Sequence, residues 1–194
     1  MGCDIHTYRE KFVDGRWQTA DPWEPYDYGE DEKGQEIPHE RRAYTGRNYN
    51  LFGLLAGVRN RDDPFAITPR GMPWDVSPEV KMACEQWDSD GHSHTYLYIH
   101  ELTSLRRWVS QRVIPVSGMM RRDQLAKLTT SIESGKPDWQ LLYPYCQGTT
   151  DPFQTEFSVE IPMDFMVGKC LDEMISSFKG IDGENHRLVF WFDN

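Results

Sequence analysis

Residues 3–19 read CDIHTYREKFVDGRWQT, and this stretch decides the fold class because it has the pattern of a β-hairpin. Two strands are expected, over residues 3–12 and 16–19, joined at Val13-Asp14-Gly15. An Asp-Gly pair between strand-like runs is a strong signal for a tight antiparallel turn. The sequence therefore predicts an antiparallel sheet whose first strand carries Asp4 and His6.

The remaining segments alternate between helical and strand-like patterns. Residues 20–46 contain several Pro and Gly residues and no sustained period, so we expect a long loop there, a length typical of functional loops such as lids. Helices are expected over 49–58, 77–87, 101–110, 123–133 and 163–178, with a strand or loop over 92–99 and strands over 156–161 and 187–192. This order predicts a single α+β domain over residues 1–194, with a mostly antiparallel sheet and packed helices.

Two short motifs concentrate the groups that can do chemistry. Asp90-Gly91-His92-Ser93-His94 holds two imidazoles and a carboxylate, and Cys3-Asp4-Ile5-His6 is a partial echo of it. Three of the six histidines of the chain lie in these two windows. In extended segments side chains alternate between faces, so we expect Asp4 and His6 to share a face with Tyr8, and His92 and His94 to share one with Tyr96.

These groups fit two kinds of site. Imidazole and carboxylate groups can bind a divalent metal ion such as Zn, Mn or Mg. The ligands would be Asp4, His6, His92 and His94, and Asp90 would be a further ligand or would hydrogen-bond to a ligand. Alternatively, His6 and one of His92 or His94 divide the roles of base and acid without a metal. The sequence leaves the metal site and the metal-free pair both open. A third interpretation is that His92 and His94 are only polar residues of a half-exposed strand.

Arginines and tyrosines near the motifs are candidates for substrate binding. Arg47, Arg59 and Arg70 lie at loop edges, where a guanidinium can hold a phosphate through two hydrogen bonds. Tyr8 and Tyr96 are expected beside the histidines and would line the same site. Each arginine could equally be solvated or paired with an acid.

Composition limits the classes of partner and setting. A net charge of −10 argues against a broad surface for duplex nucleic acid, which requires clustered Lys and Arg. The four cysteines, Cys3, Cys84, Cys146 and Cys170, form no Cys-x-x-Cys pair, which fits a reducing cytoplasm. No apolar run suggests a membrane segment, and the sequence leaves a homo-oligomer open.

Several segments together resemble a family of uncharacterised small proteins encoded in phage and prophage genomes. The likeness is carried by MGCDIH (1–6), RNYNLF (47–52), PRGMPWDVS (69–77), DGHSH (90–94) and VFWFDN (189–194). This resemblance implies no established activity. It implies a viral accessory protein in the bacterial host cytoplasm, where nucleotides and defence signals are common targets.

Two enzyme families show a more partial likeness. Asp4-Ile5-His6 and Gly91-His92-Ser93-His94 resemble the first and last metal-binding motifs of calcineurin-like metallophosphoesterases, although the intervening Gly-Asp and Gly-Asn-His motifs are missing. His6-Thr7-Tyr8 and His94-Thr95-Tyr96 are similar to the paired motifs of two-histidine phosphodiesterases, with the Thr one position early. Both likenesses imply phosphate-ester chemistry.

The sequence therefore favours a hydrolase, a phosphodiesterase that degrades a small nucleotide or cyclic nucleotide signal, acting as a phage counter-defence protein. The alternative is a non-catalytic phage protein that sequesters a nucleotide messenger or binds and inhibits a host protein. The chain's seven Trp, nine Tyr and nine Phe could stack on bases or anchor an interface, although core packing accounts for most aromatics in proteins.

Overall fold

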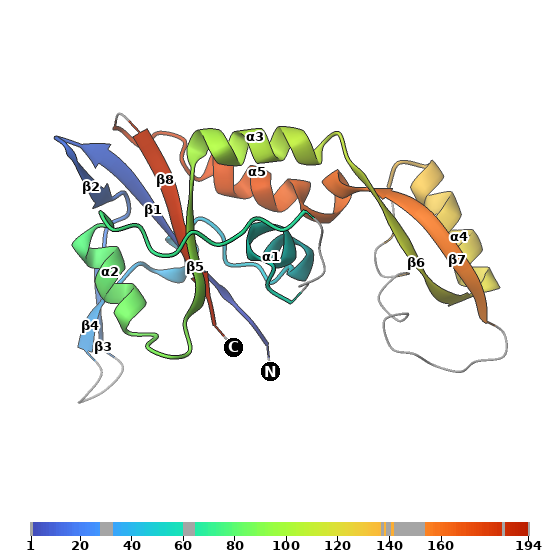
Figure 1. The fold of residues 1–194 in the computed structure, drawn as a ribbon, viewed down its shortest axis with the longest axis horizontal. Coiled ribbons are helices and arrows are strands. Elements are labelled where there is room, and N and C mark those ends of the chain that lie inside the picture. Colours follow the sequence, from blue (N-terminus) through green and yellow to red (C-terminus); the bar gives the residue numbers. More distant parts are fainter. Residues whose placement is uncertain are drawn as a thin grey trace. The chain divides into compact units, whose positions relative to one another are not determined.

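A computed structural model describes residues 2–27, 33–59, 65–136, 138, 141, 154–183 and 185–193 (Figure 1). Cys146, Asn194 and residues 28–32 of the expected long loop lie outside the described residues. The observed helices and mostly antiparallel strands confirm the α+β class. The chain divides into two compact units, Met1–Arg107 with Lys169–Asn194 (unit 1) and Trp108–Gly168 (unit 2). The expectation of a single domain therefore stays a prediction.

Unit 1 is built on a four-stranded antiparallel sheet in the order β2-β1-β8-β5. Its strands are β1 (Ile5–Val13), β2 (Arg16–Thr19), β5 (His92–Tyr98) and β8 (Asn185–Phe192). The predicted hairpin is confirmed: β1 pairs with β2, and Asp14 and Gly15 both have positive φ, as a tight hairpin turn between twisted strands requires. The central position of β8 explains its unbroken apolar run, because a strand covered on both faces needs apolar side chains on both.

Helices of unit 1 also form where the sequence indicates. They are α1 (Tyr49–Ala56), α2 (Pro78–Glu85), α3 (Ile99–Val109) and α5 (Lys169–Ser176), whereas a short 3₁₀ helix, η1 (His39–Arg41), forms within the region predicted as loop. The Asn48 side chain accepts hydrogen bonds from two backbone N–H groups at the start of α1, and Gly57 ends the helix in the left-handed conformation. Ser77 precedes α2 as expected, but its hydroxyl makes no cap bond.

The two faces of the sheet are covered by different helices. On one face, Tyr8, Val189 and Trp191 pack against Val80 and Ala83 of α2. On the other, Phe52 of α1 contacts Phe192, with ring centroids 5.0 Å apart. Figure 1 shows α1, α3 and α5 together on that second side. Burial of each large apolar side chain in such layers contributes roughly 1.5–3 kcal/mol to the stability of the fold. The sheet is therefore a stable support for the side chains at its end.

Three strands form where none was expected. β3 (Glu24–Asp27) and β4 (Lys33–Glu36) pair within the region predicted as loop. In unit 2, β6 (Val113–Arg121) pairs along its whole length with β7 (Gln154–Pro162). β7 confirms the strand expected over 156–161, whereas β6 lies in a region with no predicted element.

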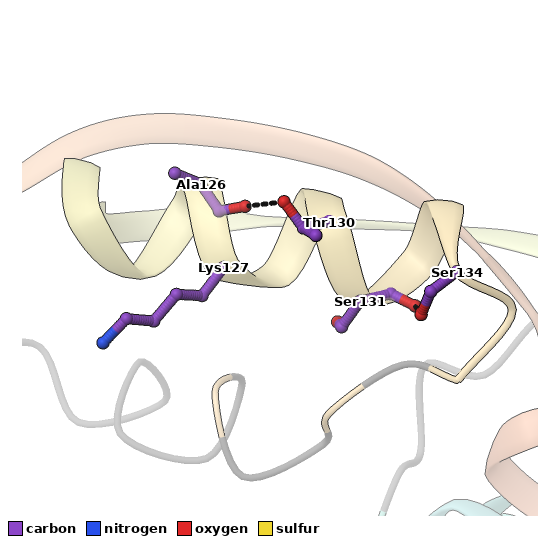
Figure 2. A pocket seen from close by; sticks show the side chains of 5 residues that line it. All are labelled: Ala126, Lys127, Thr130, Ser131 and Ser134. Atoms are coloured by element: carbon purple, nitrogen blue, oxygen red, sulfur yellow. Dashed lines mark hydrogen bonds between the residues drawn. The ribbon is translucent and has the colours of Figure 1, made fainter.

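The described part of unit 2 contains this two-stranded antiparallel sheet and the helix α4 (Arg122–Glu133), which lies between the two strands in sequence. Leu128 of α4 packs on Met120 and Phe157 of the two strands. A shallow pocket lies on α4 (Figure 2), lined by Ala126, Lys127, Thr130, Ser131 and Ser134. It contains none of the predicted site residues. A π-helix, η4 (Asp164–Gly168), follows β7 and leads into α5, so the single helix expected over 163–178 is in fact two segments.

In the parts of the chain that the structure describes, helices are too short or too polar to cross a membrane.

Candidate active site

The two histidine motifs meet at one end of the sheet of unit 1, on either side of β8. His6 of β1 lies opposite Trp191 of β8, and the imidazole and indole ring centroids are 5.8 Å apart. His94 of β5 stacks on Trp191 at 5.9 Å. The expectation that the first strand lies directly beside the His92–Tyr96 segment is wrong, because β8 separates them. Both imidazoles nevertheless lie against the Trp191 indole.

A bulge in β5 separates the second pair of histidines. His92 lies opposite Phe192 and Thr95 opposite Phe190, so β5 has one residue more than β8 over this interval. Ser93 takes up the extra residue with a φ of 53°. His92 consequently stacks on Phe192, which points to the other face from Trp191. The expected shared face of His92 and His94 is therefore wrong, and only His94 joins His6.

Trp87 and Gly91, in the turn between α2 and β5, complete the surroundings. The Trp87 ring centroid lies 4.0 Å from that of His6. A Cβ atom on Gly91 would lie 3.1 Å from Trp87 Cβ, 3.5 Å from His94 Nε2 and 3.6 Å from Trp191 Cδ1. The glycine therefore permits a close approach to Trp87 and His94 that a larger residue would disturb. We call His6, His94, Trp87 and Trp191 the imidazole–indole cluster.

His6 is the most constrained member of this cluster. Its side chain is 6% exposed, and Nε2 lies 3.1 Å from Oδ2 of Asp193. The other ring nitrogen, Nδ1, is buried and has no hydrogen-bond partner among the residues that the structure describes. Burial lowers the pKa of His6, and the hydrogen bond that the ring makes to the Asp193 carboxylate only partly opposes this effect. The ring is therefore neutral at neutral pH.

His94 is also neutral. Burial lowers its pKa, and the positive charge that His92 can carry adds to the effect. A neutral imidazole can accept a proton or bind a metal, so both candidates are in a form that can react. The Nε1 atom of Trp191, like Nδ1 of His6, is buried without a hydrogen-bond partner within the described part of the chain. Most buried polar atoms in proteins have a hydrogen-bond partner, so these two nitrogens distinguish the imidazole–indole cluster.

His92 and Asp90 lie outside the cluster. The Nδ1 atom of His92 is 3.0 Å from the Ser93 hydroxyl, and its Nε2 is buried without a partner in the described segments. Asp90 is exposed in the turn before β5, where its N–H donates to the Trp87 carbonyl. Neither residue contacts the rings of His6 or His94 through a described hydrogen bond.

The four proposed metal ligands do not form one coordination sphere. Both carboxylate oxygens of Asp4 accept hydrogen bonds from Arg47, at 2.9 and 2.7 Å, and this interaction lowers the pKa of Asp4. His6 faces Asp193, and His92 lies on the opposite face from His94. Within the described ranges there is no group of three or more His, Cys, Asp or Glu side chains arranged to hold a metal ion.

The predicted substrate-binding residues have other contacts. Arg59 donates to the Gly2 carbonyl, and Arg70 makes a two-pronged ion pair with Glu101 at 3.0 and 2.7 Å. Tyr8 is buried and stacks on Trp191, and burial raises its pKa. The Arg70 guanidinium lies over the Tyr96 ring, with Cζ 5.4 Å from the ring centroid. Phosphate would have to compete with these partners.

Sequence reasoning missed the residues that hold the two histidines in place. Asp193 bonds His6, and the two indoles of Trp87 and Trp191 lie against the imidazoles. The available signal was the terminal strand VFWFDN, in which a carboxylate follows an apolar run. Its pairing with β1 could not be derived from spacing.

A scan against protein-family models, a search of curated proteins and a search of solved structures each find no match for this chain. The resemblances to a phage family and to two phosphodiesterase families therefore stay hypotheses based on short motifs.

Proposed function

We propose that this protein is a phosphodiesterase that degrades a small nucleotide or cyclic nucleotide signal, with His6 and His94 as its acid–base pair. The observation that supports this most strongly is the contact of two imidazoles with one indole, Trp191, although 87 residues of sequence separate them. Two positioned imidazoles are sufficient for acid–base hydrolysis of a phosphodiester.

The roles follow from the hydrogen bonds. His6, with Nε2 against a carboxylate, has Nδ1 available to take a proton from an attacking water. His94 would then give a proton to the leaving oxygen as the phosphorus–oxygen bond breaks, and the two protons balance over the cycle. Because burial lowers the pKa of His94, the protonated acid is scarce at neutral pH, so activity should be assayed at about pH 6 as well as about pH 7.5.

Access to His6 is the main demand of this proposal. The side chain is 6% exposed, so the attacking water must transfer its proton to Nδ1 through an ordered water or after the Trp87 side chain turns away. Arg47, Arg59 and Arg70 would bind the phosphoryl oxygens by exchanging their present partners. The resemblance to a phage family favours a counter-defence role in the host cytoplasm.

The test is nucleotide turnover by the purified protein and by His94→Ala. Loss of a positioned acid should lower kcat at least about a hundredfold. His100→Ala is the matched control, because His100 is exposed on α3 and outside the imidazole–indole cluster. Equal activity of His94→Ala and wild type on a cleaved nucleotide would contradict the assignment.

A second candidate function, a non-catalytic binder of a nucleotide messenger or a host protein, is favoured by a different residue. Trp74 is 95% exposed, and an exposed tryptophan is a typical binding anchor. Product analysis separates the two functions, because an enzyme converts excess nucleotide whereas a binder returns it intact on heating. A panel of linear and cyclic nucleotides that stays uncleaved while one of them binds tightly would replace hydrolysis by sequestration.

A further inference from the structure

The contact between Asp193 and His6 has a geometry that fixes the state of the imidazole. Asp193 directly follows β8, and its N–H donates to the Asp4 carbonyl at 3.2 Å. In return, Oδ1 of Asp193 accepts the Asp4 N–H at 2.7 Å. The carboxylate is thus tied to the backbone of the neighbouring strand, and Oδ2 is the atom directed at His6 Nε2.

Only one arrangement of protons satisfies these contacts. An ionised carboxylate can only accept, so the backbone N–H of Asp4 occupies one oxygen and the imidazole must donate Nε2–H to the other. In a neutral ring the proton on Nε2 leaves a lone pair on Nδ1. The Nδ1 atom is buried and has no hydrogen-bond partner within the described residues, so no acceptor there favours the tautomer with the proton on Nδ1.

We propose that Asp193 is a positioning residue that holds His6 as the Nε2–H tautomer and so presents Nδ1 as the proton acceptor. The inference rests on the proposed function only for the use to which Nδ1 is put; the tautomer itself follows from the contacts. A carboxylate that orients an imidazole in this way is worth a large factor in hydrolases, because the wrong tautomer cannot act as the base.

Asp193→Asn tests this assignment without a change of shape. The side-chain oxygen of the variant must stay on the Asp4 N–H, since an amide NH₂ there would face another donor. The NH₂ group is then directed at His6 Nε2, where it meets a second donor unless the ring moves its proton to Nδ1. We expect the variant to contain His6 as the Nδ1–H tautomer. Asp182→Asn is the control, because Asp182 is 87% exposed and bonds Lys11 instead.

The measurement is a long-range ¹H–¹⁵N correlation spectrum of the full chain labelled at histidine nitrogens, which distinguishes protonated from unprotonated ring nitrogens. The His6 signals are assigned by their loss in His6→Gln. We expect Nε2–H in wild type and in Asp182→Asn, and Nδ1–H in Asp193→Asn. An Nδ1–H signal for wild-type His6 would overturn the proposal whatever the variant does. An unchanged Nε2–H signal in a folded Asp193→Asn protein would also overturn it.

Kinetics then link the tautomer to the reaction. Asp193→Asn should lower kcat by roughly a hundredfold or more with KM little changed, because the base is misdirected while the binding groups remain. A switched tautomer with unchanged kcat would overturn the positioning role. If wild type has the Nε2–H tautomer and cleaves no nucleotide, the assignment of the imidazole stands and the phosphodiesterase function fails.

Discussion

Replacing Glu10 by Gln should strongly destabilise unit 1, because Glu10 neutralises a buried arginine. The side chains of Glu10 and Arg187 are 0% and 1% exposed, and Glu10 Oε2 accepts from Arg187 Nε at 2.7 Å. Oε1 accepts the Ser77 N–H at 2.7 Å. The amide oxygen of the variant can keep the Ser77 bond only by directing NH₂ at the guanidinium, so a charge pair becomes two opposed donors.

The magnitude depends on what Arg187 retains. Removing one partner of a buried ion pair costs about 3–5 kcal/mol, because the other charge stays buried without compensation. Arg187 keeps Asp75, whose Oδ1 lies 2.7 Å from Nη1, and its guanidinium lies over Trp17 at 4.0 Å from the ring centroid. These contacts favour the lower end of the range, about 3 kcal/mol in the free energy of unfolding.

Urea unfolding followed by tryptophan fluorescence measures this cost in a double-mutant cycle of Glu10→Gln, Arg187→Met and the pair together. The double variant should recover part of the loss, because no unpaired charge remains in the interior. Glu85→Gln is the control: it breaks an exposed pair with Lys81 at 3.8 Å and should cost under about 0.5 kcal/mol. A cost for Glu10→Gln below about 1 kcal/mol would refute the argument.

Three further outcomes are expected. Activity should survive exhaustive chelation if the two imidazoles are sufficient for the reaction. If chelation abolishes activity and added Mn²⁺ or Zn²⁺ restores it, the reaction requires a metal ion. Burial lowers the pKa of His6 and His94 below the ordinary value of 6.5, so the unfolded chain takes up protons at a higher pH than the folded protein does. The stability from these two residues is therefore full above about pH 6.5 and falls as the pH drops toward their folded-state pKa. Urea unfolding at about pH 7 and about pH 5 should show this decline, and the decline should be smaller in His94→Gln. Gly91→Ala should lower turnover, because the added Cβ would lie 3.1 Å from Trp87 Cβ and must displace Trp87 beside His94; an unchanged kcat would mean that the placement of Trp87 does not affect the reaction.

Local patterns predicted the local structure well. Asp14-Gly15 predicted the β1–β2 hairpin, and the helix expected from residue 49 begins there after Asn48, although it ends at Gly57 instead of residue 58. These features depend on residues that are neighbours in sequence, so their physics is contained in a short window. β6 was missed because Pro115 and Gly118 interrupt its strand pattern, whereas its pairing with β7 supplies the order that the local sequence does not.

The site was predicted less well, because its geometry depends on register. Alternation correctly placed His6 and Tyr8 on one face, where both stack on Trp191. The same rule failed for His92, since a single extra residue with a positive φ at Ser93 reverses the face. Asp193 lies 187 positions from His6 in sequence, and no spacing rule connects residues that far apart.

The central position of β8 has a consequence for biosynthesis. β1 and β5 have no strand pairing with each other, and each relies on β8, which a ribosome completes after both of them. Until β8 emerges, one edge of each earlier strand lacks its partner and is open to association with other chains. Pairing of residues as far apart in sequence as Ile5 and Phe192 also slows folding, because the long loop between them must close before the contact can form. Chaperone dependence of the nascent chain should therefore be greatest just before β8 leaves the exit tunnel.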